Sequence, residues 1–171
     1  MRAATAFMAS IGFAASLGVH LLTFFDVSLP DRQPALWALH VGVFVVFIPF
    51  CFIALADIGI ARKYDWWRTL FRRHPRWVLR AVYALFAYAI LNFFLGIALT
   101  HGGVADSRGG TMVLQSHGSI ITTLSPDEYE HYQALTARMF SGHWLLFYGI
   151  PLLYLGTTRE TDTLKKHDIA P

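Results

Sequence analysis

The stretch from Leu36 to Ile60 reads LWALHVGVFVVFIPFCFIALADIGI, and His40 and Asp57 are its only residues with a basic or acidic side chain. A run of about 20 apolar residues is what crosses a hydrocarbon core of about 30 Å as a helix. The stretch is therefore predicted to be a transmembrane helix.

Three further apolar runs have the same character and cover about residues 4–25, 78–100 and 140–157. Hydrophobic residues make up 55% of the 171 positions and charged residues 15%, against roughly 25% charged in an ordinary soluble domain. We therefore predict an all-α membrane protein, in which a four-transmembrane-helix bundle forms a single domain over residues 1–171. The sole cysteine, Cys51, lies within the second run and leaves no disulfide framework within one chain.

Basic residues are distributed unevenly among the segments between these runs. With the amino terminus in the cytoplasm, eleven of the 14 Lys and Arg residues lie in cytoplasmic segments, and only Arg32, Arg108 and Arg138 lie outside. Cytoplasmic loops of membrane proteins carry an excess of Lys and Arg. The count predicts a multi-pass protein with both termini in the cytoplasm. Because topology accounts for the net charge of +3, we expect no nucleic-acid partner.

The segment from about residue 101 to 138 is a sizeable external insertion. Two β-prone runs, residues 111–115 and 119–123, are separated by Ser116-His117-Gly118, which predicts a possible β-hairpin. Ser125-Pro126-Asp127-Glu128 is a capping box with Pro at the first helical position. We therefore expect one helix from Pro126 to Thr157, with the strip from Met112 to Leu124 packed against the part that projects from the membrane.

The cytoplasmic loop at residues 62–80 interleaves aromatic and basic side chains. Tyr64, Trp66, Trp67, Leu70, Phe71 and Trp77 alternate with Arg68, Arg72, Arg73 and Arg76. A short helix here could lie flat on the bilayer, with its rings at headgroup depth and its guanidinium groups on an anionic lipid. The plainer interpretation is an aromatic belt combined with positive-inside anchoring.

Histidines on three of the predicted helices fall at one depth. Counting five residues inward from each outer boundary reaches His20, His40 and His143, roughly 7 to 8 Å below the surface at about 1.5 Å per residue. His20 follows Gly12 and Ser16 at spacings of four, which is a ridge of small residues that favours close helix packing. The third helix offers Tyr88 and Asn92 as the floor of a cavity in the outer half of the bundle.

Imidazole is a common ligand of haem iron and of metal ions, and helical bundles bring such ligands together. One hypothesis is a redox or ligand-binding membrane component in which two of the histidines ligate haem b. In a second, His20, His40 and His143 all ligate one Zn or Cu ion. The alternative is that each imidazole satisfies its own hydrogen bonds. The protein would then be a cofactor-free accessory membrane protein that binds lipids or a partner subunit.

Two segments resemble a known group of proteins. LHVGVFVVFIP at residues 39–49 and FSGHWLLFY at residues 140–148 are similar to the second and fourth helices of an uncharacterised family of small four-helix bacterial inner-membrane proteins. The resemblance implies a bacterial plasma membrane and brings no activity or ligand with it.

Overall fold

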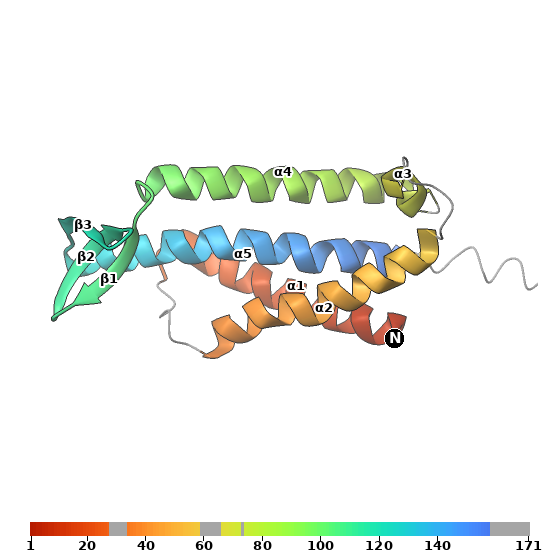
Figure 1. Ribbon diagram of the computed structural model, residues 1–171, viewed down its shortest axis with the longest axis horizontal. Coiled ribbons are helices and arrows are strands. Elements are labelled where there is room, and N and C mark those ends of the chain that lie inside the picture. Colours follow the sequence, from red (N-terminus) through yellow and green to blue (C-terminus); the bar gives the residue numbers. More distant parts are fainter. Residues whose placement is uncertain (28–33, 59–65, 73, 158–171) are drawn as a thin grey trace, which may run out of the picture.

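The computed structural model describes residues 1–27, 34–58, 66–72 and 74–157, and Figure 1 shows four long helices lying lengthwise. A small sheet lies at one end of this bundle and a short helix at the other (Figure 1). In chain order the elements are α1 (Arg2–Leu22), the 3-10 turn η1 (Thr23–Phe25), α2 (Pro34–Ile58), α3 (Trp66–Phe71), α4 (Arg76–Leu99), β1 (Val104–Arg108), β2 (Thr111–Ser116), β3 (Ser119–Thr123) and α5 (Pro126–Thr157).

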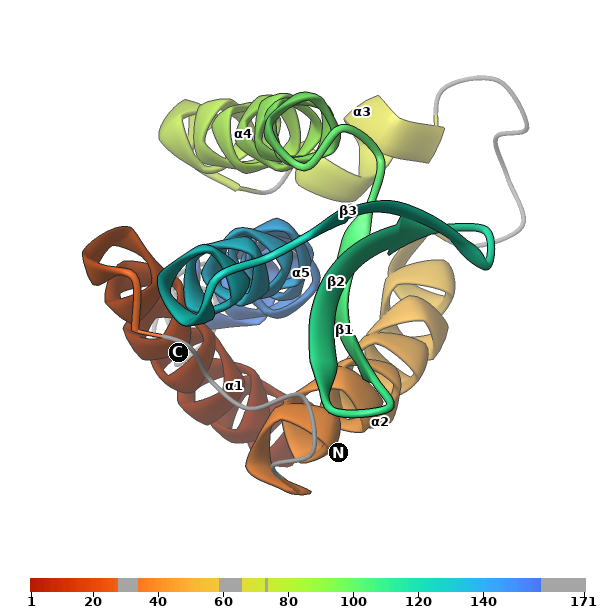
Figure 2. The same ribbon diagram turned by 90° about the vertical axis from the view of Figure 1, so that its left-hand side faces the viewer.

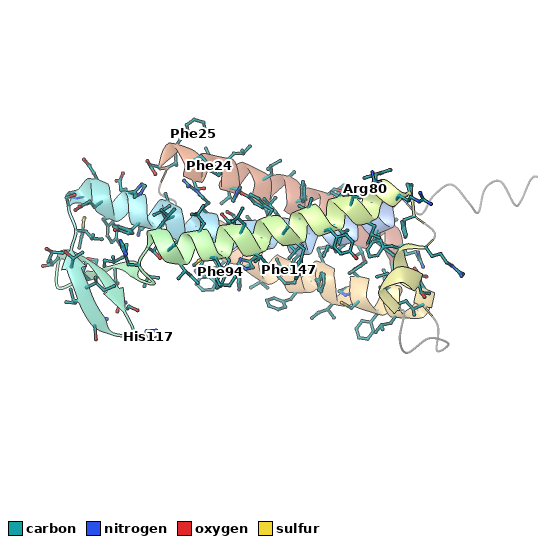
Figure 3. The ribbon with its side chains drawn as sticks, turned by 90° about the horizontal axis from the view of Figure 1, so that it is seen from above. Phe24, Phe25, Arg80, Phe94, His117 and Phe147 are labelled. Atoms are coloured by element: carbon teal, nitrogen blue, oxygen red, sulfur yellow. The ribbon has the colours of Figure 1, made fainter. Side chains whose placement is uncertain are left out.

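Three of the described helices are long and apolar enough to cross a membrane: Arg2–Phe25, Leu36–Ile58 and Arg76–Leu99. Many of their large apolar side chains are exposed on the outside of the bundle, which would be unfavourable in water. Phe25 is 79% exposed and Phe94 is 63% exposed, and Figure 3 shows both on the outside of the bundle. A soluble domain rarely leaves so much contiguous apolar surface uncovered.

Helix α5 is the central helix. Viewed along the bundle from the sheet, it lies between α4 on one side and α1 and α2 on the other (Figure 2). Its buried residues are Ala134, Leu135, Ser141, Gly142, Trp144, Leu145, Leu146, Tyr148, Gly149, Pro151 and Tyr154. Because this helix packs against protein on most sides, its surface can be less apolar than that of its three neighbours. α5 is not among the three described helices of membrane-spanning character, so the predicted bundle of four transmembrane helices is confirmed only as far as those three.

The predicted helix from Pro126 to Thr157 is confirmed, residue for residue. Its start is held by the predicted capping box: the Glu128 N–H donates to Ser125 Oγ at 3.3 Å, and the Ser125 N–H donates to Glu128 Oε2 at 2.8 Å. Two N–H groups that the first turn leaves without helical partners are thereby satisfied.

Small residues allow α1 to approach α5 closely. The buried residues of α1 recur every three or four positions, as Thr5, Ala9, Gly12, Ser16 and His20, which confirms the ridge predicted from sequence. At Gly12 an added Cβ would overlap the ring of Tyr148 on α5.

The insertion holds one strand more than predicted. The β2–β3 hairpin is confirmed, and β1 pairs antiparallel with β2 in the order β1-β2-β3, with Val104 opposite Gln115. Leu114 and Val113 of β2 are 1% and 2% exposed, so the sheet packs its central strand against protein, and its contacts are with α5. The predicted hairpin is thus corrected to a three-stranded sheet, which packs against α5.

The short helix α3 accounts for part of the predicted aromatic loop. Leu70 and Phe71 are 6% and 5% exposed and pack with Tyr154 in the core, so these two side chains face the protein and not a lipid surface. Trp77 is 53% exposed, as an interfacial residue would be. Arg72 and Arg76 are also exposed. The side chains at positions 62–68 and 73 lie outside the described part of the chain.

Candidate functional site

His20 joins three helices in the half of the bundle nearer the sheet. Its ring is 3% exposed. Its Nδ1 lies 2.7 Å from Ser141 Oγ on α5, and its Nε2 is hydrogen-bonded to the Tyr88 hydroxyl on α4. The structure therefore brings together two of the predicted site residues, His20 and Tyr88.

The direction of each hydrogen bond around His20 follows from the partners. Ser141 Oγ donates to the Arg138 carbonyl at 3.1 Å, so its hydrogen is already used. Nδ1 of His20 must then donate to Ser141, and Nε2 must accept from Tyr88. One neutral tautomer satisfies every member of the chain, with both ring nitrogens bonded to protein side chains.

Asn92 is bonded to α5 and not to a histidine. Its Nδ2 donates to the Arg138 carbonyl at 2.9 Å. The Arg138 guanidinium in turn donates to the Thr23 carbonyl at the end of α1 and lies 4.1 Å from the centroid of the Phe24 ring. These bonds hold α1, α4 and α5 in a fixed position relative to one another along the bundle axis near the sheet.

His40 lies in a different environment, between α2 and α5. The indole N–H of Trp144 donates to His40 Nδ1 at 3.2 Å. Four aromatic rings meet the imidazole edge to face at centroid distances of 6.2 to 6.3 Å: Trp37, Phe44, Phe140 and Trp144. Because Nδ1 accepts this hydrogen bond, Nε2 is the ring nitrogen that has the hydrogen.

His143 bonds within its own helix. Its Nδ1 donates to the Met139 carbonyl at 2.9 Å, and its ring lies edge to face with Phe93 of α4 at 5.3 Å. It shares no partner with His20 or with His40.

The three predicted imidazoles thus have separate partners. Among the residues that the structure describes, no group of three His, Cys, Asp or Glu side chains is placed to hold a metal ion. The common cavity that a haem or a Zn or Cu ion would need gains no support from this arrangement, and the hydrogen-bonding alternative accounts for every bond just described.

A second polar cluster lies at the opposite end of the bundle, near α3. Asp57 of α2 pairs with Arg2 of α1 and accepts a hydrogen bond from the Tyr154 hydroxyl at 2.8 Å. Tyr154 belongs to α5, so the carboxylate links three helices. Arg62 and Lys63, the basic residues that follow Asp57 in the sequence, lie outside the described residues.

His74 adds the loop before α4 to this cluster. It is 9% exposed, its Nδ1 lies 2.8 Å from Thr157 Oγ1, and its ring lies 4.5 Å from that of Tyr154. Its Nε2 is buried without a hydrogen-bond partner. Burial lowers the pKa of His74, and the Asp57 carboxylate opposes this by raising it.

The His74 shift predicts a loss of stability in mild acid. Above its ordinary pKa of 6.5 the imidazole is neutral in both the folded and the unfolded states. As the pH falls through that value, the unfolded chain takes up a proton that the folded chain does not, so the free energy of unfolding decreases. Thermal unfolding between about pH 8 and about pH 5 should show this decrease, with a shallower slope in His74→Gln. The exposed His117→Gln is the control, and an equal slope in wild type and His74→Gln would contradict the assignment.

Sequence reasoning missed three of these residues. The sequence patterns gave Arg138, Ser141 and His74 no place in a functional site. Spacing contained a signal for Ser141 alone, since the small pair Ser141-Gly142 marks a point where α5 approaches a neighbour closely.

The sheet presents an uncovered edge. β3 is an edge strand whose five residues are all exposed, including Ile120 at 55% and Ile121 at 48%. None of the five is charged and none is Pro. Charged residues and Pro on an edge strand oppose pairing with another chain, as does a β-bulge. Of these features β3 has only the register shift opposite Leu114 and Gln115.

Comparison with protein-family models, with curated proteins and with solved structures finds no match to this chain. The fold therefore defines the class of protein only as far as a mostly helical chain with three helices of membrane-spanning character and a small antiparallel sheet.

Proposed function

We propose that this chain is a cofactor-free accessory protein of a bacterial plasma membrane that docks another membrane protein through the exposed edge of its sheet. The observation that carries the proposal is β3, an uncharged edge strand exposed on all five residues. The separate hydrogen-bond partners of the three histidines support the absence of a cofactor, because each imidazole has a structural role.

The proposal places four helices in the membrane, with α5 as the fourth and central span. The apolar part of α5, residues 140–157, is slightly shorter than the about 20 residues that cross a hydrocarbon core. Its place in the membrane therefore depends on packing against the neighbouring helices. Most of its polar groups face those neighbours: Ser141 bonds to His20, and Tyr148 donates to the Leu39 carbonyl at 2.8 Å. Lipid would therefore meet mainly α1, α2 and α4.

The sheet is placed on the outer side and both termini in the cytoplasm. Arg2, Arg72, Arg76 and Arg80 lie at the end opposite the sheet, and Figure 3 shows Arg80 there on α4. Only Arg108 and Arg138 of the described basic residues lie at the sheet end. This distribution follows the positive-inside rule.

The partner that suits β3 is an extended segment with aliphatic side chains and no charge. Such a segment would add a strand to the sheet and satisfy the free backbone groups of β3, while the exposed side chains of Ile120 and Ile121 would gain apolar contacts. In this proposal α5 is one unbroken helix that extends from the membrane to the sheet and contacts β1 and β2. The edge of the sheet would therefore lie at a fixed distance from the membrane surface. A partner in the same membrane would meet it in one register.

Photocrosslinking in native membranes tests the docking proposal. A benzophenone side chain introduced at Ile121 should yield one reproducible adduct whose peptide comes from another membrane protein, whereas the same probe at Thr111 should not. Ile120→Lys should abolish the adduct, because Lys on an edge strand opposes pairing. Ser107→Lys places the same charge on β1 and should leave the adduct intact. Adducts only to lipid or to a second copy of this chain would overturn the proposal.

A further inference from the structure

The sheet and α5 enclose a groove at the base of the external part. Its volume is about 350 Å³, and its lining includes Val104 and Asp106 of β1, Gln115 of β2, and Gln133, Thr136 and Phe140 of α5. This volume is at the small end of the range for ligand sites. It matches a lipid headgroup better than a whole lipid.

The groove is polar at one end and apolar at the other. Val104 and Phe140, which are 43% and 46% exposed, lie toward the bundle. Asp106 and Gln133 lie farther along β1 and α5, away from the bundle. Gln115 is paired with Val104, and its amide reaches along β1 to Asp106. With the membrane placement proposed above, on which this inference rests, the apolar end faces the bilayer.

The charges in the groove are compensated internally. Asp106 Oδ2 accepts from Gln115 Nε2 at 3.2 Å and from Arg108 Nε at 3.3 Å. Arg108 also donates to Gln115 Oε1 at 2.7 Å, and no lining residue is basic. A phosphate group would meet the Asp106 carboxylate without a free cation in the lining.

Neutral hydrogen-bonding groups remain available to a ligand. Within the described residues, the side-chain amide of Gln133 makes no hydrogen bond. The Thr136 hydroxyl uses its hydrogen on the Tyr132 carbonyl at 3.0 Å, which leaves its oxygen free to accept. β1 is an edge strand, so backbone groups on its outer side have no strand partner.

We propose that this groove binds the uncharged polar head of a membrane lipid, a head with hydroxyl or carbonyl groups, while the apolar tail stays in the bilayer beside Phe140. The head would bond to Gln133, Thr136 and the edge of β1. Two kinds of lipid have this chemistry, diacylglycerols and isoprenoid quinones, and the experiment separates them.

The test uses the full chain in phosphatidylcholine nanodiscs, with a diacylglycerol that has a photoreactive diazirine near its glycerol. Labelling should saturate and should map to peptides containing residues 104–106 and 133–140. Unlabelled dioleoylglycerol or decylubiquinone should compete, and the stronger competitor identifies the source. Phosphatidylglycerol should compete about tenfold less well, the difference expected from one unfavourable charge contact.

Matched variants locate the site. Thr136→Phe fills the groove and should reduce saturable labelling about tenfold, and Gln133→Leu, which keeps the size and removes the amide, should weaken it about fivefold. Thr111→Phe adds the same bulk at the exposed hairpin tip and should change nothing. The inference would be overturned if labelling did not saturate, or if Thr136→Phe and Gln133→Leu were labelled as strongly as the wild type. Competition by phosphatidylglycerol as strong as that by the uncharged lipids would also overturn it. Crosslinking from Ile121 reports on partner docking separately, so either proposal can fail alone.

Discussion

Gly12→Ala should lower the free energy of unfolding by about 3 kcal/mol, the upper part of the range for overpacking a filled core. Gly12 lies in α1 directly against the ring of Tyr148, and a Cβ there would overlap three ring carbons. Tyr148 is 2% exposed and packs with Ala9, Val43, Val46 and Trp144. The ring therefore has no room to move aside.

Gly42 on α2 provides a matched second site on the same ring. An added Cβ at Gly42 would overlap the Tyr148 hydroxyl, while the next nearest ring atom, Cζ, would lie at an ordinary 3.7 Å. Gly42→Ala should cost about 2 kcal/mol, because the hydroxyl is held by the Leu39 carbonyl. Tyr148→Phe removes the hydroxyl and should restore most of that loss. The same background should not rescue Gly12→Ala, since the ring carbons remain.

Unfolding in mixed micelles with increasing SDS measures both double-mutant cycles. Coupling between positions 42 and 148, and none between 12 and 148, is the expected pattern. If Gly12→Ala were neutral, or if both cycles showed equal coupling, α1, α2 and α5 could not pack around Tyr148 as the structure has them.

Local signals in the sequence were sufficient for several elements. The start of α5 follows from Ser125 and Glu128, because a capping box acts through neighbouring residues only. The hairpin follows from the turn at His117-Gly118, where both residues have positive φ. Neither prediction needed knowledge of the tertiary fold.

β1 could not be predicted in this way. Its sequence, VADSR, contains a single β-branched residue and two charges, which is a weak strand signal. The strand forms because residues 104–108 pair with β2. Ala105 is only 9% exposed and packs against the rest of the sheet and α5. Tertiary pairing decides the conformation here, and local propensity does not.

The histidine layer shows a different limit. Counting residues along a helix gives depth, but the direction of a side chain turns by about 100° with each residue. Gly12 and Ser16 gave the direction of His20, which does face the bundle. No comparable ridge flanks His40 or His143, and their rings have separate partners on α5 and α4. Equal depth was therefore insufficient to predict a common site.

His20→Ala should cost about 3 kcal/mol of unfolding free energy, because it removes a buried ring and leaves Ser141 and Tyr88 without their partner. His20→Phe separates these contributions. A phenyl ring fills much of the space, so the remaining loss of about 1 to 2 kcal/mol reports on the hydrogen bonds. His143→Ala should cost less than about 1 kcal/mol, since His143 is only half-buried and bonds to a carbonyl of its own helix.

Absorption spectra of the same variants decide between a structural and a cofactor role for the histidines. A purified wild-type protein without a Soret band and without stoichiometric Zn or Cu, together with the unequal stabilities of His20→Ala and His143→Ala, is the result expected if each imidazole acts through its own bonds. A cofactor held jointly by His20, His40 and His143 would behave differently. Each Ala substitution would then remove the same chromophore or metal ion, and the three losses would be alike, because a ligand set fails when any member is absent. That result would return the chain to the haem or metal class and displace the accessory role proposed above.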